Sequence, residues 1–130
     1  MTKEKLDVLL VDDEAIVGER LKVSLEKAGF SVETFSSSQS ALESLRSEHY
    51  DMLVTDLKMS GPDGMDVLRE AKQTNPDIKA VVITGFATTE TAQEALSSGA
   101  VIFLAKPFKM SELREILLDL AKDEGTDNDQ

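Results

Sequence analysis

The chain has 130 residues, about the size of one domain, and with 41% hydrophobic residues it can bury a core. Its formal net charge of −11 argues against sequence-independent binding of nucleic acid and against binding to an anionic membrane surface. It has no cysteine for a disulfide or a thiolate metal site, no apolar signal segment after residues 1–5, and no apolar run near the ~20 residues of a membrane span, so we expect a cytoplasmic protein.

The first part of the chain predicts two strands, each followed by a helix. Residues 7–11 form a compact apolar run that is typical of a buried strand. Residues 31–35 alternate polar and apolar, which indicates a second strand with one less buried side, and the serines 36–38 can cap the next helix. Gly29 fits the position just after the end of the first helix. The apolar stripes of the two helices are Val17, Leu21, Leu25 and Ala28, then Ala41, Leu42 and Leu45.

The middle of the chain predicts a third strand that ends in a single carboxylate. Within residues 50–56, the apolar run 52–54 leads to Asp56, and a loop rich in glycine and proline follows. A third helix should end at Asn75, because Pro76 comes next. Its apolar residues are Met65, Val67, Leu68 and Ala71.

The last part predicts two more strands, at residues 79–84 and 101–104, separated by a helix over 88–98. A fifth helix should begin near Ser111 and lose its apolar stripe after Ala121. That stripe comprises Leu113, Ile116, Leu117, Leu120 and Ala121.

This alternation of apolar strands with amphipathic helices is typical of an α/β domain with a five-stranded parallel sheet and helices on both faces. We expect a short lead over residues 1–5, one domain over 6–122, and an acidic, disordered tail over 123–130.

Polar residues follow four of the strands, and parallel strands bring their carboxyl ends to one edge. The residues in question are Asp12, Asp13, Asp56, Thr84 and Lys106. Two carboxylates ~4 Å apart repel by about 4 kcal/mol at an effective dielectric of 20, which a divalent cation between them would relieve. Oxygen ligands without nearby histidine or cysteine favour Mg²⁺, with Mn²⁺ as the alternative, over Zn²⁺.

This set of residues can also carry phosphoryl chemistry. The Asp56 carboxylate is a candidate nucleophile toward phosphorus, which would give an aspartyl phosphate. Lys106 offers a cation and Thr84 a hydroxyl donor to phosphoryl oxygens, and a metal would add to both. Asp12 and Asp13 could also be ordinary carboxylates at the start of a helix, without a chemical role. Asp13 and Glu14 suit the start of a helix, where the dipole favours negative charge.

In this order and on these elements, Asp12-Asp13, Asp56, Thr84, Phe103 and Lys106-Pro107 resemble the receiver domain of two-component response regulators, and the resemblance covers residues 6–122. It implies a flavodoxin-like (βα)5 fold with strand order 2-1-3-4-5. The local sequence patterns alone do not determine this order. The resemblance also implies a cis peptide bond between Lys106 and Pro107.

The resemblance implies a role for each site residue. Asp56 would accept a phosphoryl group from a sensor histidine kinase or a phosphotransfer protein and would pair with Lys106 beforehand. Thr84 and Phe103 would switch in response, although Phe103 by its position in an apolar strand fits a core residue better. Asp13, Asp56 and the backbone carbonyl of Lys58 would ligate Mg²⁺ directly, and Asp12 would act through the water shell of the metal or as a more distant ligand. The face formed by the fourth helix, fifth strand and fifth helix would contact a downstream protein partner or form a weak homodimer.

Two further positions vary in receiver domains and tune how fast the phosphoryl group is lost; here they are Lys58 and Phe86. We expect Phe86, just after Thr84-Gly85, to screen the phosphoryl group from water. The chain would be a signalling switch, an enzyme only toward its own phosphorylation and dephosphorylation. No DNA-binding segment follows residue 122 in this sequence, so the chain works alone or is one piece of a longer protein.

Three other functions are compatible with parts of this pattern. A phosphatase of the haloacid dehalogenase type would need a second aspartate two residues after Asp56, where Lys58 stands. A receiver-like binding module that is never phosphorylated would not need the intact acidic set. A flavodoxin would need a phosphate-binding loop after the first strand, where Asp12 and Asp13 would repel the flavin phosphate.

Overall fold

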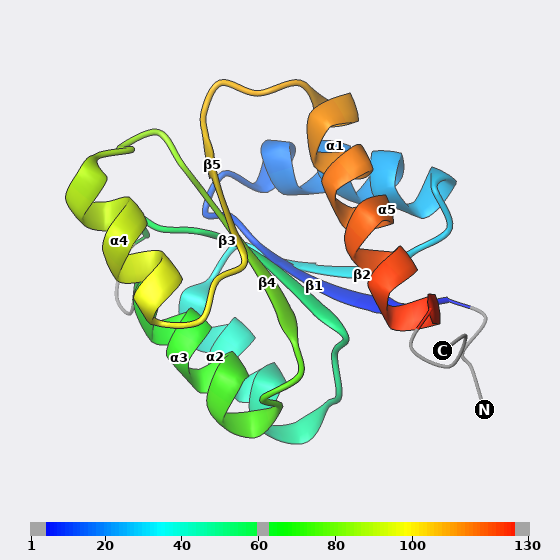
Figure 1. Ribbon diagram of the computed structural model, residues 1–130, viewed down its shortest axis with the longest axis horizontal. Coiled ribbons are helices and arrows are strands. Elements are labelled where there is room, and N and C mark those ends of the chain that lie inside the picture. The colour runs from blue at the N-terminus through cyan, green and yellow to red at the C-terminus, as the bar shows by residue number, and fades with distance from the viewer. Residues whose placement is uncertain (1–4, 60–62, 127–130) are drawn as a thin grey trace.

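The computed structural model describes residues 5–59 and 63–126, in which five strands alternate with five helices (Figure 1). The strands are β1 (Asp7–Val11), β2 (Ser31–Phe35), β3 (Met52–Asp56), β4 (Lys79–Thr84) and β5 (Ile102–Ala105). The helices are α1 (Ala15–Lys27), α2 (Ser38–Ser47), α3 (Gly64–Thr74), α4 (Thr89–Ser97) and α5 (Met110–Thr126). Within these residues no helix is both long and apolar enough to cross a membrane.

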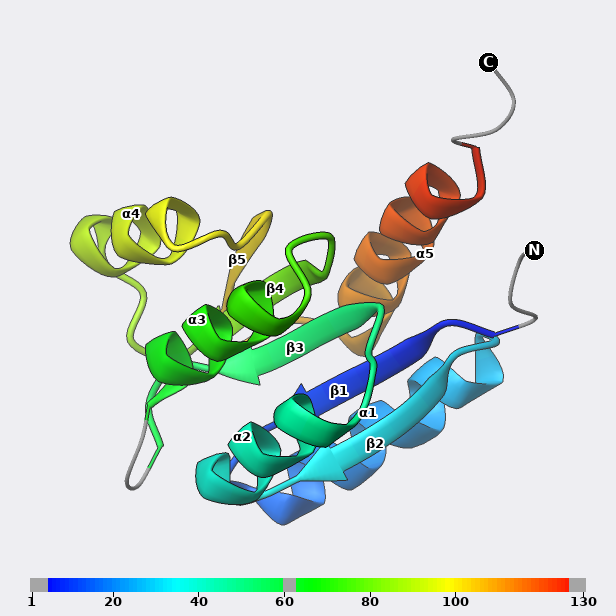
Figure 2. The same cartoon turned by 90° about the horizontal axis from the view of Figure 1, so that it is seen from below.

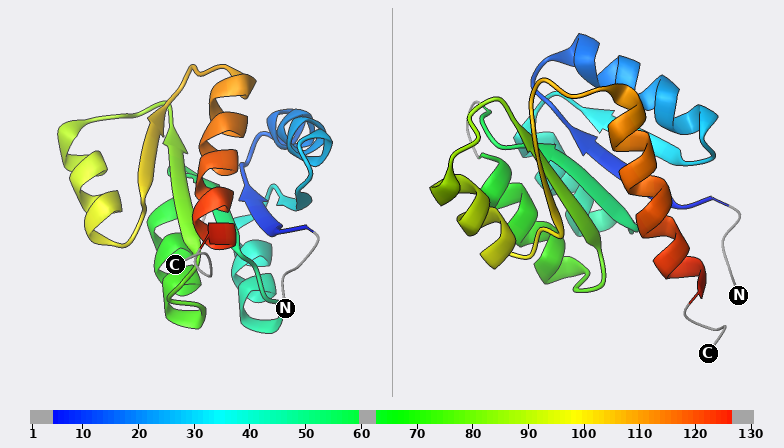
Figure 3. Two further views of the ribbon diagram at one scale, coloured as in Figure 1. Left: turned by 45° about the vertical axis from the view of Figure 1, so that its right-hand side comes forward. Right: turned by 45° about the horizontal axis from the view of Figure 1, so that its top comes forward.

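The strands form one parallel sheet in the order β2-β1-β3-β4-β5, which confirms the expected architecture. Helices α1 and α5 cover one face, and α2, α3 and α4 cover the other (Figures 1 and 2). All strands run the same way, so the loops after β4 and β5 lie at the same edge of the sheet (Figure 3). The fold therefore gathers the segments that follow the strands at one edge.

The core consists of two apolar layers, one on each face of the sheet. Residues of one strand alternate between the layers: Leu53 packs toward α2 and α3, whereas Met52 and Val54 pack toward α1 and α5. Every residue of β3 is buried, as the continuous apolar run predicted. β2 lies at an edge of the sheet and has exposed positions, in agreement with its alternating pattern.

Several predicted helix boundaries are confirmed by their capping contacts. Ser37 caps α2, and its Oγ accepts a hydrogen bond from the Ser40 N–H at 3.2 Å. Gly29 follows α1 with φ of 105°, a conformation that glycine adopts without steric cost. Asn75 is the C-cap of α3, directly before Pro76.

Two boundaries differ from the expectation. β5 begins at Ile102 and includes Ala105, because Thr84 of β4 pairs with Ala105, while Val101 is 47% exposed. Helix α5 continues through residues 123–126, where we expected a disordered tail. An established helix extends easily, since each further residue adds one hydrogen bond without a new nucleation cost. Residues 1–4 and 127–130 lie outside the described residues.

A buried tyrosine joins β2 and α2 away from the site edge. Tyr50, only 5% exposed, donates a hydrogen bond to the Glu33 carboxylate of β2, and its hydroxyl lies 2.6 Å from the Ser44 Oγ of α2. Burial, helped by the hydrogen bond to Glu33, raises the pKa of Tyr50 from 10.0 to about 12. The folded state therefore holds the phenolic proton more tightly than the unfolded state does.

This pKa shift predicts an alkaline loss of stability. The contribution of Tyr50 is complete below pH ~10 and is lost as pH rises toward about 12, where the folded tyrosine ionises as well, an effect on the order of 2 kcal/mol. Between about pH 8 and about pH 11, the free energy of unfolding in urea should fall more for the unmodified chain than for Tyr50→Phe, which has no phenolic proton to lose. Equal drops would contradict the assignment to Tyr50.

Candidate functional site

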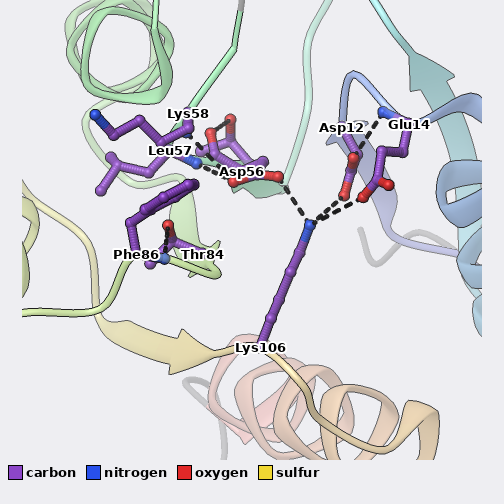
Figure 4. Close-up of polar contacts among 9 residues, drawn as sticks. Asp12, Glu14, Asp56, Leu57, Lys58, Thr84, Phe86 and Lys106 are labelled. Carbon is purple, nitrogen blue, oxygen red and sulfur yellow. Dashed lines mark hydrogen bonds and ion pairs between the residues drawn. The ribbon is translucent and has the colours of Figure 1, made fainter.

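The strand register brings the polar strand ends to one level. Val11 pairs with Thr55, Asp56 with Ile83, and Thr84 with Ala105. Asp12 and Lys106 follow directly after the first and last of these strands, and Figure 4 shows the Lys106 ammonium group between Asp12 and the end of β3. The Lys106–Pro107 peptide bond is cis, as the resemblance implied.

Three carboxylates gather at this edge. Asp12, Asp13 and Asp56 each offer an oxygen, and these oxygens lie within 4.8 Å of one another. Asp12 and Asp56 are buried, at 1% and 6% exposure, whereas Asp13 is exposed. Close, partly desolvated carboxylates repel strongly unless cations compensate them. The donor set is all oxygen, which fits a hard divalent cation.

Lys106 supplies one compensating charge. Its Nζ lies 2.8 Å from Asp56 Oδ2, 3.2 Å from Asp12 Oδ2 and 3.8 Å from Glu14 Oε1 (Figure 4). Burial by itself would lower the pKa of Lys106, but the hydrogen bonds and charges of Asp56 and Asp12 outweigh burial and raise this pKa. The ammonium group therefore stays charged between the carboxylates.

Each buried carboxylate is also held by backbone amides. Asp12 Oδ1 accepts a hydrogen bond from the Glu14 N–H at 2.9 Å, next to the start of α1. Asp56 Oδ1 accepts one from the Leu57 N–H at 2.6 Å and a longer one from the Lys58 N–H at 3.3 Å. Burial raises the pKa of Asp12, and the contacts with Glu14 and Lys106 offset only part of that rise. The orientation of both carboxylates is therefore set before any ligand binds.

Thr84 and Phe86 lie on the side of Asp56 that faces away from Asp12 (Figure 4). Thr84 is fully buried, and its Oγ1 accepts a hydrogen bond from the Phe86 N–H at 3.0 Å. Phe86 is 61% exposed, and Lys58 Nζ lies 5.5 Å from the centroid of its ring, a cation–π contact. Phe103 pairs with Val82 of β4 and is half-buried on β5 against the core layer of α2 to α4.

The sequence interpretation missed two contributors to the site. The sequence pattern places Glu14 at the start of a helix, and the structure shows that its carboxylate also contacts Lys106. The acidic run Asp12-Asp13-Glu14 was a usable signal for it. The Leu57 N–H, which makes the shortest hydrogen bond to Asp56 Oδ1, left no signal in the side-chain pattern because it is a backbone group.

Comparison with known proteins adds independent information. The family model of the response regulator receiver domain matches residues 8–118. The transcriptional regulatory protein ZraR of Escherichia coli K12 is 35% identical over 117 residues, which are 90% of this chain and 26% of that protein. The chain thus spans about a quarter of the length of this curated relative.

Solved structures agree with the family match. A response regulator receiver domain from Clostridium thermocellum is 30% identical, with a TM-score of 0.84 over 92% of this chain and 97% of that one. A response regulator from Burkholderia pseudomallei, solved with a phosphorylated aspartic acid, a calcium ion and citrate, is 25% identical, with a TM-score of 0.81 over 95% of this chain and 75% of that one. With a match over most of its length and the acidic cluster at the expected edge, this chain belongs to the receiver domain family of two-component response regulators.

Proposed function

We propose that Asp56 accepts a phosphoryl group from a phosphohistidine of a sensor histidine kinase or phosphotransfer protein. A carboxylate oxygen attacks phosphorus while the P–N bond breaks, and the electron pair of that bond goes to the imidazole nitrogen. The observation that carries the proposal is the Asp56 carboxylate, held within the acidic cluster and 2.8 Å from Lys106 Nζ. The phosphorylated aspartic acid of the Burkholderia pseudomallei relative supports it.

The same cluster fits Mg²⁺, with Mn²⁺ as the alternative, because its donors are all oxygens. Asp12, Asp13 and Asp56 would hold the cation, together with the backbone carbonyl of Lys58. When bound, the cation neutralises charge on the phosphoryl oxygens and on the clustered carboxylates.

The remaining roles fall to side chains near Asp56. Lys106 offers its ammonium group to the phosphoryl oxygens, in place of the contact it makes with Asp56 Oδ2. Thr84 Oγ1 accepts a hydrogen bond from the Phe86 N–H and keeps its own proton to donate. A small rotation of the Thr84 side chain would let this hydroxyl donate to a phosphoryl oxygen. Phe103, half-buried on β5, would follow by turning inward.

The product stays on the chain, so we propose a signalling switch that catalyses only its own phosphorylation and dephosphorylation. The added charge at Asp56 would be transmitted through Thr84 and Phe103 to the face of α4, β5 and α5. That face would then bind a downstream protein partner or a second copy of the chain.

The proposal is tested by intact mass spectrometry after incubation with a small phosphodonor and Mg²⁺. One phosphoryl group should be added to the unmodified chain and none to Asp56→Asn, which keeps the side-chain shape but loses the nucleophile. A folded, unmodified chain that gains no mass would refute phosphorylation and favour a binding module. Steady multiple turnover of a generic phosphate ester would instead indicate a phosphatase.

A second prediction concerns the lifetime of the phosphorylated state. Phe86 is exposed beside the site and holds the Lys58 ammonium group over its ring, so together they would limit the approach of water to the phosphoryl group. Phe86→Ala should speed dephosphorylation by several-fold, in line with a contact of about 0.5–1 kcal/mol. Loss of phosphoryl mass over time measures this rate, and Val101→Ala is a control at an exposed apolar position beyond the site. An unchanged rate in Phe86→Ala would refute the screening role.

A further inference from the structure

The first residue of α3 touches the backbone of Asp56. A Cβ on Gly64 would lie 2.1 Å from the Asp56 carbonyl oxygen and 2.7 Å from Leu57 Cα, far closer than real Cβ contacts. The Gly64 N–H donates a hydrogen bond to the Leu57 carbonyl oxygen at 2.9 Å. Only glycine therefore allows α3 to begin against the Asp56–Leu57 peptide.

Other contacts hold the same peptide. Thr55, fully buried, donates a hydrogen bond from Oγ1 to the Asp56 carbonyl oxygen at 2.9 Å. The Leu57 N–H points to the Ile83 carbonyl oxygen at 3.2 Å and to Asp56 Oδ1 at 2.6 Å. A rotation of this peptide would weaken all of these contacts together.

The start of α3 is itself firmly placed, so an added methyl group would displace the peptide. Asp63 Oδ1 accepts hydrogen bonds from the N–H groups of Met65 and Asp66, and Asp66 Oδ2 accepts one from the Asp63 N–H at 3.0 Å. This reciprocal arrangement is a capping box. Val67 and Leu68, fully buried one turn further on, fix the helix against the sheet.

We propose that Gly64 and Thr55 are positioning residues for phosphoryl transfer. Together they fix the Asp56–Leu57 peptide, whose N–H orients the Asp56 carboxylate on the side opposite Lys106. Reactivity depends steeply on such orientation, since a misplacement of ~1 Å can cost about a hundredfold in rate. The inference rests on the proposed function of Asp56 and adds two residues that do not touch the phosphoryl group.

The test compares Gly64→Ala with Gly18→Ala. Gly18 is a buried glycine of α1 whose added Cβ would meet Leu10 Cδ2 at 3.6 Å and Thr34 Cβ at 3.8 Å, ordinary contact distances. The rate of phosphorylation is measured at saturating small phosphodonor and Mg²⁺ and divided by the folded fraction from urea unfolding. Gly64→Ala should be about tenfold slower or more, and Gly18→Ala should match the unmodified chain.

A second readout separates positioning from general destabilisation. The ¹H–¹⁵N resonance of Leu57 should move in Gly64→Ala, because its hydrogen bond to Asp56 Oδ1 lengthens, and should stay in place in Gly18→Ala. If Gly64→Ala does not fold, Thr55→Val carries the test. This variant keeps the side-chain shape, removes the hydrogen bond to the Asp56 carbonyl, and should slow phosphorylation several-fold with the same shift of Leu57.

The outcomes are distinguishable. An unmodified chain that takes up no phosphoryl group overturns the proposed function itself. An unmodified chain that is phosphorylated, together with a folded Gly64→Ala of normal rate and unmoved Leu57 resonance, overturns the positioning role. If Gly64→Ala does not fold, a normal phosphorylation rate in Thr55→Val overturns the positioning role.

Discussion

Replacing Lys106 with methionine is expected to lower the free energy of unfolding by about 3–5 kcal/mol in metal-free buffer, the usual cost of removing one partner of a buried ion pair. The side chains of Asp12 and Asp56 are 0% and 8% exposed, and both depend on Lys106 for a nearby positive charge. Methionine keeps an unbranched side chain, one atom shorter than that of lysine, and removes the charge and its hydrogen bonds. Urea unfolding in the presence of a chelator measures the change.

The matched control is Lys109→Met, which makes the same change of net charge at an exposed position in the following loop and should alter stability by no more than about 0.5 kcal/mol. Mg²⁺ should recover more stability in Lys106→Met than in the unmodified chain, because binding to the folded state alone is stabilising and Lys106 no longer competes for the carboxylates. Equal stability of the two lysine variants in chelator would show that the carboxylates do not need Lys106.

Asp13→Asn is expected to weaken Mg²⁺ binding and phosphorylation strongly, with little change in the free energy of unfolding. Asp13 is exposed, so its replacement leaves the core and the Lys106 contacts intact. It contributes one of the three oxygens of the cluster, and even the loss of an outer partner of a metal ligand costs about tenfold to a hundredfold in metal affinity or activity. Mg²⁺ affinity and the phosphorylation rate at fixed Mg²⁺ should therefore both fall by at least that factor.

Asp77→Asn is the control, since Asp77 is an exposed carboxylate in the loop before β4, at the opposite edge of the sheet. It should leave the Mg²⁺ affinity and the phosphorylation rate unchanged. High Mg²⁺ should restore part of the activity of Asp13→Asn, because weaker binding is overcome by concentration. Normal Mg²⁺ affinity in Asp13→Asn would exclude this residue as a ligand.

The strands were predictable because their apolar runs are short and sharply bounded. Residues 7–11 and 79–84 coincide with β1 and β4, since central strands covered on both faces need continuous apolar sequence. The edge strand β5 was placed less well. Val101 is apolar and counted as strand; its N–H bonds to the Ala80 carbonyl oxygen of β4 at 2.8 Å, but its side chain is exposed and the paired register begins at Ile102. Local hydrophobicity does not encode which residues pair at an edge.

By itself the sequence determined which chemical groups follow the strands: Asp12 and Asp13 after β1, Asp56 at the end of β3, and Lys106 after β5. Only the tertiary structure decided their distances, because Lys106 meets residues 50 and 94 positions away through the register of the parallel sheet. The contact of Gly64 with the Asp56 backbone has the same origin. The sequence specifies the residue types, whereas the orientation of the site groups to within an ångström depends on how separate elements pack against one another.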